Sequence, residues 1–319
     1  MAPLPKPRAS TLRAIQRALE EGHGDWESVG VPAGNIGWEC DRQIWLAFRR
    51  ASVPEFIDWR KRRIFERGNI EEERLLDLLR LIGCEVTGQQ ERVRAAGGHL
   101  RGKIDGRAYG LPEAPKTEHL IECKSSKDDK FQELKKKGVK VAQPHHYATF
   151  QFYMHRLGLT RVMYMCTGKN DEDLHLERVE YDAEFAIQAV ARIERIINMP
   201  TPPSRLCSKR DDFRGRFCRQ AEVCWGEIMP RAHCRTCIHA TPLMDGNAGW
   251  DCARWSKPIS LAEQDAGCPA QLFIPELLPA YEQIDVSEEN ETITYRHRTT
   301  GQLWIDGAAP TTDATNAAA

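Results

Sequence analysis

Apolar positions in the first quarter of the chain recur every three to four residues, which is the period of an amphipathic helix. The pattern predicts helices over residues 10–22, 38–50 and 54–83. Gly68 interrupts the third helix and is followed by an acidic run, Glu71–Glu73. The glycines and prolines between the first two helices are typical of a connecting segment.

From residue 84 onward, short apolar runs and alternating apolar and polar residues predict strands. The expected strands are Cys84–Thr87, the stretch carrying Asp105, Leu120–Lys124, 161–166 and 174–181. Helices are expected over 144–158, with proline in the first turn and glycine at the end, and over 183–199. The basic segment 125–140 has few apolar residues, which predicts a mobile loop. This order predicts an α/β fold with a central mixed β-sheet flanked by helices.

Three charged residues are candidates for chemistry. Asp105 precedes Glu122 by seventeen residues, and Lys124 follows two positions later. Side chains alternate between the faces of a strand, so Glu122 and Lys124 point the same way while Cys123 points the opposite way. Charges gathered at the end of apolar strands are costly unless a cation and an anionic substrate complete the site. A divalent metal on Asp105 and Glu122, with Lys124 facing a phosphate, satisfies all three charges. The other interpretation is an exposed ion pair on a solvated strand.

This D-x16-E-x-K arrangement resembles the PD-(D/E)XK nuclease superfamily. From about Gly37 to Cys224 the chain is similar to its RecB-like, phage-type exonuclease branch. That branch includes lambda exonuclease and the iron–sulfur nucleases of recombination and CRISPR spacer acquisition. The resemblance implies a restriction-endonuclease-like core that holds Mg²⁺ or Mn²⁺ through Asp105, Glu122 and the backbone carbonyl of Cys123. It also implies DNA as substrate and a recombination protein as a further partner.

The resemblance also implies an additional acidic ligand on the long helix. In the family this ligand follows a glycine by four positions, and Glu72 stands four residues after Gly68, with Glu71 close behind. Glu72 would complete the metal shell directly or through water. The other interpretation of this run is a solvated acidic turn.

The family places a glutamine, and often a tyrosine, on the helix beside the E-x-K strand. Gln151 fits the position found in the phage exonucleases, whereas Gln143 with Tyr147 fits the RecB-style spacing, and the register stays open. We expect Gln151 and Tyr147 to position Lys124 or the phosphate backbone of the substrate.

Length and composition are those of a globular protein larger than one average domain. The chain has 319 residues, of which 41% are hydrophobic and 29% charged, and its formal net charge is −1. This charge excludes a polycationic DNA coat. It leaves a nucleic-acid partner open, because basic residues are concentrated at Arg60–Arg63 and Lys135–Lys137. Each run is equally typical of a solvated helix face.

The cysteines indicate the redox compartment. No segment approaches the ~20 apolar residues of a membrane span, and the first residues lack the apolar segment of a secretory signal. The eleven cysteines therefore favour reduced thiols and metal ligands over a disulfide framework. We expect a cytoplasmic location without membrane association.

A first set of cysteines follows the predicted core. Cys207, Cys218 and Cys224 form a Cys-x10-Cys-x5-Cys pattern in a charged segment, and thiols this close in a cytosolic chain usually hold a metal. The resemblance supplies Cys40 as the fourth ligand of a [4Fe–4S] cluster. The iron–sulfur relatives show a tighter spacing, and Gly215 stands where an earlier cysteine is expected, so Cys207 would substitute from farther away. A zinc ion and plain buried thiols are the other interpretations.

A second set begins with a Cys-x2-Cys knuckle. Its members are Cys234, Cys237, Cys252 and Cys268. Four thiols within 35 residues predict a closed structural zinc site in a zinc-ribbon-like module, in which His233 or His239 could replace a cysteine. Arginines near this set would let the module grip DNA or a partner protein; they are Arg231, Arg235 and Arg254.

These patterns predict five segments along the chain. They are an amino-terminal helix and linker at 1–36, a nuclease core at 37–228, a four-cysteine zinc-binding module at 229–280, a terminal hairpin at 281–306 and a disordered tail at 307–319. The favoured function is a Mg²⁺- or Mn²⁺-dependent DNA exonuclease of phage or recombination type, with endonuclease action left open. The alternative is a non-catalytic DNA- or protein-binding adaptor that uses the zinc module on a nuclease-fold scaffold. The intact Asp105, Glu122 and Lys124 disfavour that alternative.

Overall fold

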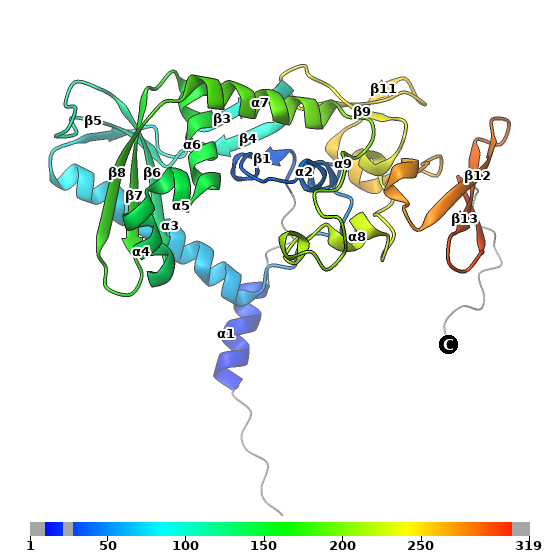
Figure 1. Ribbon diagram of the computed structural model, residues 1–319, viewed down its shortest axis with the longest axis horizontal. Coiled ribbons are helices and arrows are strands. Elements are labelled where there is room, and N and C mark those ends of the chain that lie inside the picture. The colour runs from blue at the N-terminus through cyan, green and yellow to red at the C-terminus, as the bar shows by residue number, and fades with distance from the viewer. Residues whose placement is uncertain (1–9, 22–27, 308–319) are drawn as a thin grey trace, which may run out of the picture. The chain divides into compact units, whose positions relative to one another are not determined.

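The computed structural model describes residues 10–21 and 28–307, which form two compact units of mixed α/β structure (Figure 1). Among the described residues, the first unit comprises 10–21, Ser28, Pro54–Val93 and Lys103–Asp182, and the second comprises Val29–Val53, Arg94–Gly102 and 183–307. The boundaries predicted from the sequence are consecutive along the chain, because no local pattern shows that residues 29–53 pack with residues beyond 183. The tail predicted to be disordered lies, apart from Gly307, outside the described residues.

The first unit is built on a five-stranded sheet in the order β2-β5-β6-β7-β8. β5 pairs antiparallel with β2 and β6, β6 pairs parallel with β7, and β7 pairs antiparallel with β8, so the sheet is mixed as predicted. Its strands are Glu85–Thr87 (β2), Gly106–Tyr109 (β5), His119–Ser126 (β6), Arg161–Gly168 (β7) and Leu174–Glu180 (β8). The helices of this unit are Ser10–Glu20 (α1), Trp59–Leu81 (α3), Asp128–Lys137 (α4), Val139–Ala142 (α5) and Pro144–Leu157 (α6).

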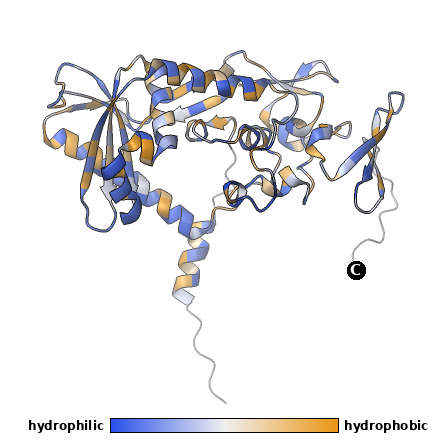
Figure 2. Cartoon of the chain, viewed as in Figure 1, coloured by the Kyte–Doolittle hydropathy of each residue, from blue (hydrophilic) through white to orange (hydrophobic). Residues whose placement is uncertain are grey.

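Helices lie on both faces of this sheet. On one face, the buried leucines of α3 pack with alternate residues of β6 and β7; the cluster includes Leu75, Leu76, Leu79, Ile121, Cys123, Met163 and Met165. Figure 2 shows hydrophobic and hydrophilic residues interspersed along α3, as expected of a helix with one buried side. On α6, the Phe150 ring lies 6.2 Å from the ring of Tyr164. Because Tyr164 alternates with Met163 and Met165, α6 covers the opposite face.

The prediction of a mobile loop over 125–140 is wrong. Residues Asp128–Lys137 form α4, with acidic residues in the first turn and three lysines in the last, an order that suits the helix dipole. Phe131 and Leu134 are both 0% exposed. These two apolar residues, three positions apart, are enough to attach one side of a short helix to the core.

The second unit contains three small sheets, with strand orders β1-β4-β3, β9-β10-β11 and β12-β13-β14. Their strands are Val31–Pro32 (β1), Arg92–Ala95 (β3), Leu100–Lys103 (β4), Ala240–Pro242 (β9), Trp250–Cys252 (β10), Lys257–Pro258 (β11), Tyr281–Ser287 (β12), Thr292–His297 (β13) and Leu303–Asp306 (β14). The helices are Asp41–Phe48 (α2), Ala183–Asn198 (α7), Ala221–Trp225 (α8) and Leu261–Ala266 (α9). The predicted terminal hairpin is confirmed as β13 and β14, to which β12 adds a third strand.

Large aromatic residues form the core of the second unit. The ring of Phe48 stacks on that of Trp250 at 5.3 Å, and Trp45 is fully buried near the start of the same unit. Both cysteine sets belong to this unit, whereas Asp105, Glu122 and Lys124 belong to the first. Across the described residues, no helix combines the length and apolar character needed to cross a membrane.

Candidate active site

Asp105 lies at a break between two strands and reaches the middle of the sheet. It follows β4 and directly precedes β5, where Gly106 pairs with Ile121 of β6. This register brings the Asp105 carboxylate beside β6, and its Oδ2 atom accepts a hydrogen bond of 2.7 Å from the Cys123 backbone N–H. The sequence analysis expected Asp105 within a strand, and the structure places it at the corner instead.

Lys124 occupies the centre of a group of oxygen atoms. Its Nζ atom lies 2.6 Å from Oε1 of Glu122 and 3.6 Å from Oδ2 of Asp105, and it donates to the Cys123 carbonyl oxygen at 2.9 Å. Strand alternation therefore directs Glu122 and Lys124 to one face, while the Cys123 side chain joins the α3 cluster on the other. The ammonium contacts the same three oxygens that the sequence analysis assigns to a metal ion.

The site carries more negative than positive charge. Burial raises the pKa of the Glu122 carboxyl to about 7, because it outweighs the opposing effect of Lys124, and Asp105 adds to the rise. Burial by itself would lower the pKa of Lys124, but Glu122 and Asp105 raise it above its usual range. Two carboxylates thus compete for one ammonium in a poorly solvated place, and an additional cation would relieve that competition.

The long helix α3 adds a third carboxylate from Glu72. Burial raises the pKa of Glu72, and Asp105 is the next largest cause, so the two carboxylates lie within electrostatic reach of each other. Gln90 donates a 2.8 Å hydrogen bond to Oε1 of Glu72. The neighbouring Glu71 turns elsewhere, since it accepts from the Thr167 hydroxyl at 2.6 Å. Of the acidic run, Glu72 is thus the residue that faces the candidate site.

Gln151 and Tyr147 are not brought to Lys124. The Gln151 amide donates to the Glu180 carbonyl at 2.9 Å and accepts from the Asp182 backbone N–H at 2.8 Å. The Tyr147 hydroxyl donates to the Asp182 carboxylate at 3.2 Å. Both side chains therefore join α6 to the end of β8, because they lie on the side of α6 that faces this connection.

A different side of α6 faces the charged cluster. Burial raises the pKa of Tyr153, and the nearby carboxylates of Glu122 and Asp105 raise it further. The Nδ1 atom of His146 lies 2.9 Å from the Tyr164 hydroxyl, and burial together with Lys124 lowers the pKa of His146 to about 3. His146 and Tyr153 are seven residues apart, which is two helical turns, so that spacing is a sequence signal for this face.

We expect Gln151→Met to reduce stability and to leave the proposed chemistry intact. The substitution keeps an unbranched side chain of similar length but removes both hydrogen bonds to the backbone, at a cost of about 1–3 kcal/mol. Urea unfolding gives the stability change, and the exposed Gln132→Met on α4 is the matched control. DNA cleavage within about twofold of wild type is expected in the folded variant. Lost cleavage at unchanged stability would return Gln151 to the catalytic group.

The first cysteine set gathers in the second unit. Burial raises the pKa of Cys218, and Cys40, Cys224 and Cys207 contribute to the rise, so all four thiols are electrostatic neighbours. A Cβ atom placed on Gly215 would lie 3.0 Å from Sγ of Cys207. Cys207 therefore fills the space beside Gly215, the position at which the resembled family predicts a cysteine. That Cys207 replaces this cysteine as a metal ligand stays a prediction.

The second cysteine set lines one pocket of about 120 Å³. Burial raises the pKa of Cys234 to about 11, with further contributions from Cys237, Cys268 and Cys252. All the cysteines are free thiols, so no disulfide joins the described residues. As placed, no group of three or more His, Cys, Asp or Glu side chains among the described residues has the arrangement of a metal site. The thiols of each set are neighbours, and metal binding by either set stays a prediction.

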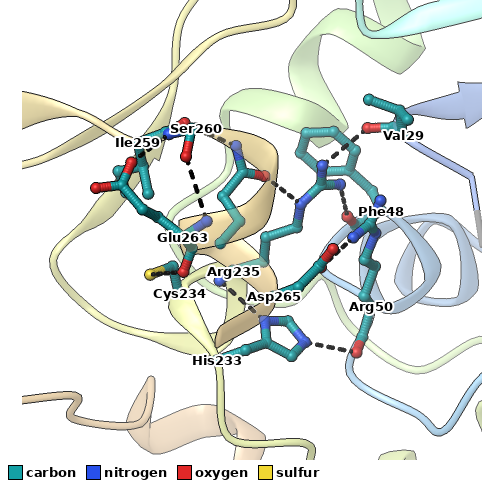
Figure 3. A network of polar contacts seen from close by, with 11 residues as sticks. Val29, Phe48, Arg50, His233, Cys234, Arg235, Ile259, Ser260, Glu263 and Asp265 are labelled. Carbon is teal, nitrogen blue, oxygen red and sulfur yellow. Dashed lines mark hydrogen bonds and ion pairs between the residues drawn. The ribbon is translucent and has the colours of Figure 1, made fainter. Parts of the chain in front are cut away.

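A buried polar network holds the Cys234 knuckle in place (Figure 3). Arg235 is 1% exposed and donates to the carbonyl oxygens of Val29 and Phe48 at 2.9 and 3.1 Å. The ring nitrogens of His233 are both engaged, one with the Arg50 carbonyl at 3.0 Å and the other with the Arg235 backbone N–H at 3.1 Å. The predictions that His233 replaces a metal ligand and that Arg235 grips DNA are therefore wrong. Both side chains are committed to the core.

No protein-family model and no curated protein matches the chain. Among solved structures, SSO0001 is 14% identical, with a TM-score of 0.40 over 70% of this chain and 99% of that one. The alkaline exonuclease LHK-Exo from Laribacter hongkongensis is 14% identical, with a TM-score of 0.37 over 58% of this chain and 90% of its own. LHK-Exo in complex with dAMP is 12% identical at the same TM-score of 0.37. These values are too low to assign a family or a function.

Proposed function

We propose that the protein is a metal-dependent deoxyribonuclease of the PD-(D/E)XK type, acting as a DNA exonuclease of the phage or recombination kind. One observation carries the proposal. The Lys124 ammonium contacts Glu122, Asp105 and the Cys123 carbonyl, which are the oxygens expected to bind a divalent cation. A positive charge is thus accommodated at the predicted position of the metal.

The donor set suits Mg²⁺ or Mn²⁺. Both are hard cations that prefer carboxylate and carbonyl oxygens, which Asp105, Glu122 and Cys123 supply. Glu72 of α3, whose pKa is raised by burial and by Asp105, would add a third carboxylate, directly or through water. A bound cation would supply charge neutralisation at the scissile phosphate and a bound water of lowered pKa. Lys124 stays protonated among these groups and would orient the attacking water or stabilise developing negative charge.

We extend the proposal to both cysteine sets. Cys40, Cys207, Cys218 and Cys224 would hold a [4Fe–4S] cluster, with zinc as the alternative, and Cys234, Cys237, Cys252 and Cys268 would hold a structural zinc ion. Buried positive charge near the second set supports it. Arg49 is 3% exposed and donates to two backbone carbonyl oxygens at 3.1 Å, and Cys237 raises its pKa while burial lowers it to about 10. The positive charge of Arg49 opposes the effect of burial, which raises the pKa of the Cys237 thiol.

A nuclease assay on matched linear and circular DNA tests the enzymatic proposal. In Mg²⁺ or Mn²⁺ we expect linear duplex to be degraded to nucleotides and closed circular DNA to persist, because an exonuclease needs an end. EDTA should reduce cleavage to background, and restored Mg²⁺ should recover it. Cleavage of the circle would change the class to endonuclease. Intact linear DNA in both metals would contradict the proposal and favour the adaptor.

A further inference from the structure

A charged cavity lies in the second unit, beside the first cysteine set. It is a groove of about 720 Å³ that Cys207 also lines. Its distinctive residues are three arginines and three aromatic side chains, Arg42, Arg205, Arg298, Trp225, Tyr281 and Tyr295. They come from α2, the segment after α7, the end of α8 and the β12–β13 sheet. Segments distant in the sequence therefore converge on one concave surface.

The arginines of this groove are not neutralised by the protein. Arg42 donates to the Pro203 carbonyl at 3.0 Å, Arg205 to the Cys224 carbonyl at 2.7 Å and Arg298 to the Pro279 carbonyl at 3.3 Å. No carboxylate among the described residues lies within 4.0 Å of any of the three guanidiniums, whereas Arg192 in the same unit pairs with Asp41 at 2.6 Å. The groove has one acidic lining residue, Glu276, so three positive charges less one leave a surplus of two.

Two residues that line the groove also carry a buried polar atom without a partner. Tyr295 is 1% exposed, and its hydroxyl makes no hydrogen bond; Arg42 is 8% exposed, and its Nε–H makes none. An unsatisfied buried donor costs about 1–3 kcal/mol, so an acceptor supplied by a ligand would recover that cost. Phosphate oxygens are acceptors that suit both a guanidinium and a hydroxyl.

The aromatic residues indicate what accompanies the phosphates. Trp225 lies under the Arg205 guanidinium at 4.4 Å, and Tyr281 and Tyr295 meet edge to face at 6.4 Å. Aromatic side chains beside unpaired arginines are typical of surfaces on which unpaired bases stack while the backbone is neutralised. In a duplex the faces of the bases are covered by their neighbours, so such a surface selects single strands.

We propose that this groove binds a single-stranded segment of DNA, with the exposed Arg205 and Arg298 on its phosphates and the partly exposed rings of Trp225 and Tyr281 against its bases. The inference rests on the proposed function for its choice of DNA as the polyanion. It assigns strand binding to the second unit and leaves hydrolysis to Asp105 and Glu122 in the first.

The test uses the full-length protein without added Mg²⁺ or Mn²⁺ and without a chelator, so that binding is measured without cleavage and any metal held by the cysteines is retained. A fluorescent oligothymidylate is titrated by anisotropy into wild type and into an Arg205→Ala/Arg298→Ala variant. Both arginines are exposed, so the fold should persist, and equal thermal midpoints verify this. The matched control is Arg195→Ala/Arg210→Ala, which removes the same charge from exposed arginines paired with Asp41 and Glu227.

We expect the groove variant to lose at least about tenfold in affinity. The slope of the logarithm of its binding constant against the logarithm of salt concentration should decrease in magnitude by about 1.4, or about 0.7 per phosphate contact. The control should stay within about twofold, and wild type should prefer the single strand to the duplex. Equal losses in the two variants, or tighter binding of polyglutamate than of the oligonucleotide, would overturn the inference. If the protein cleaves DNA but the groove variant binds the single strand as tightly as wild type, the groove proposal is wrong and the nuclease proposal stands. If the groove variant loses affinity but the wild type cleaves no DNA, the nuclease proposal is wrong and the groove proposal stands.

Discussion

Replacing either central carboxylate, Asp105 or Glu122, with its amide should greatly reduce DNA cleavage without unfolding the protein. Asp105→Asn and Glu122→Gln keep the shape of each side chain but remove charge from the group that would hold the cation. We expect Mg²⁺-dependent cleavage to fall by about two to three orders of magnitude, as when a group that stabilises transition-state charge is lost. Initial rates on linear duplex at saturating Mg²⁺ give the measurement.

A matched substitution separates loss of the site from a general loss of charge. Asp129 on α4 is exposed and belongs to the same unit, so Asp129→Asn should cleave as wild type does. Calorimetric titration with Mn²⁺ should show weaker binding in Asp105→Asn and Glu122→Gln only. Activity within a few-fold of wild type in Asp105→Asn, at an unchanged thermal midpoint, would remove Asp105 from the catalytic group.

Lys124 requires a second measurement, because its removal leaves Glu122 buried beside another carboxylate. A buried charge that loses its partner is destabilising, so lost cleavage in Lys124→Ala has two explanations. Lys116 is exposed, so Lys116→Ala serves as the control. The cleavage rates of Lys124→Ala and Lys116→Ala are compared at a temperature at which both variants are folded.

The order of elements could be predicted from the sequence because it follows from local periodicity. Helices over 54–83 and 144–158 and strands around Glu122 and Lys124 all appear in the structure, since each has its own apolar repeat or its own proline and glycine punctuation. The helix α4 was not predicted, because it lacks a clear apolar repeat of this kind. Its exposed residues outnumber its anchors, Phe131 and Leu134, so the local pattern resembles a loop.

The orientation of α6 shows what local patterns cannot provide. The helix is buried over most of its length, so several sides carry apolar residues and no single stripe marks the active-site face. Two registers were open from the sequence, Gln151 or Gln143 with Tyr147. The structure instead turns His146 and Tyr153 toward the charged cluster and commits Gln151 to the backbone. That choice is made by the packing of α6 on the sheet.

The cysteine sets show a second limit of sequence patterns. Spacing was enough to group Cys234 with Cys237, Cys252 and Cys268, because they are close along the chain. It could not show that Cys207 occupies the space in front of Gly215, which depends on the path of an irregular segment. Nor could the spacing show that both cysteine sets belong to the second unit, whereas Asp105 and Glu122 belong to the first.

Loss of one cysteine from either set should remove only the metal of that set. Four-thiolate zinc sites contribute on the order of 10 kcal/mol to folding, which is comparable to the whole stability of a domain. We therefore expect Cys218→Ser and Cys237→Ser each to lower the thermal midpoint by more than about 10 °C. Cys166→Ala, a buried cysteine of the first unit outside both sets, should lower it much less.

The metal content separates the two sets and tests each of them. Protein purified anaerobically should be brown, with broad visible absorbance that is lost in Cys218→Ser and kept in Cys237→Ser, while Cys237→Ser loses zinc. The set of Cys40, Cys207, Cys218 and Cys224 closes a loop of about 170 residues, so its loss also frees a long segment of chain. A colourless protein with two zinc ions per chain would make the first set a second zinc site. One metal or none would leave Cys40, Cys207, Cys218 and Cys224 as partly buried free thiols without a metal.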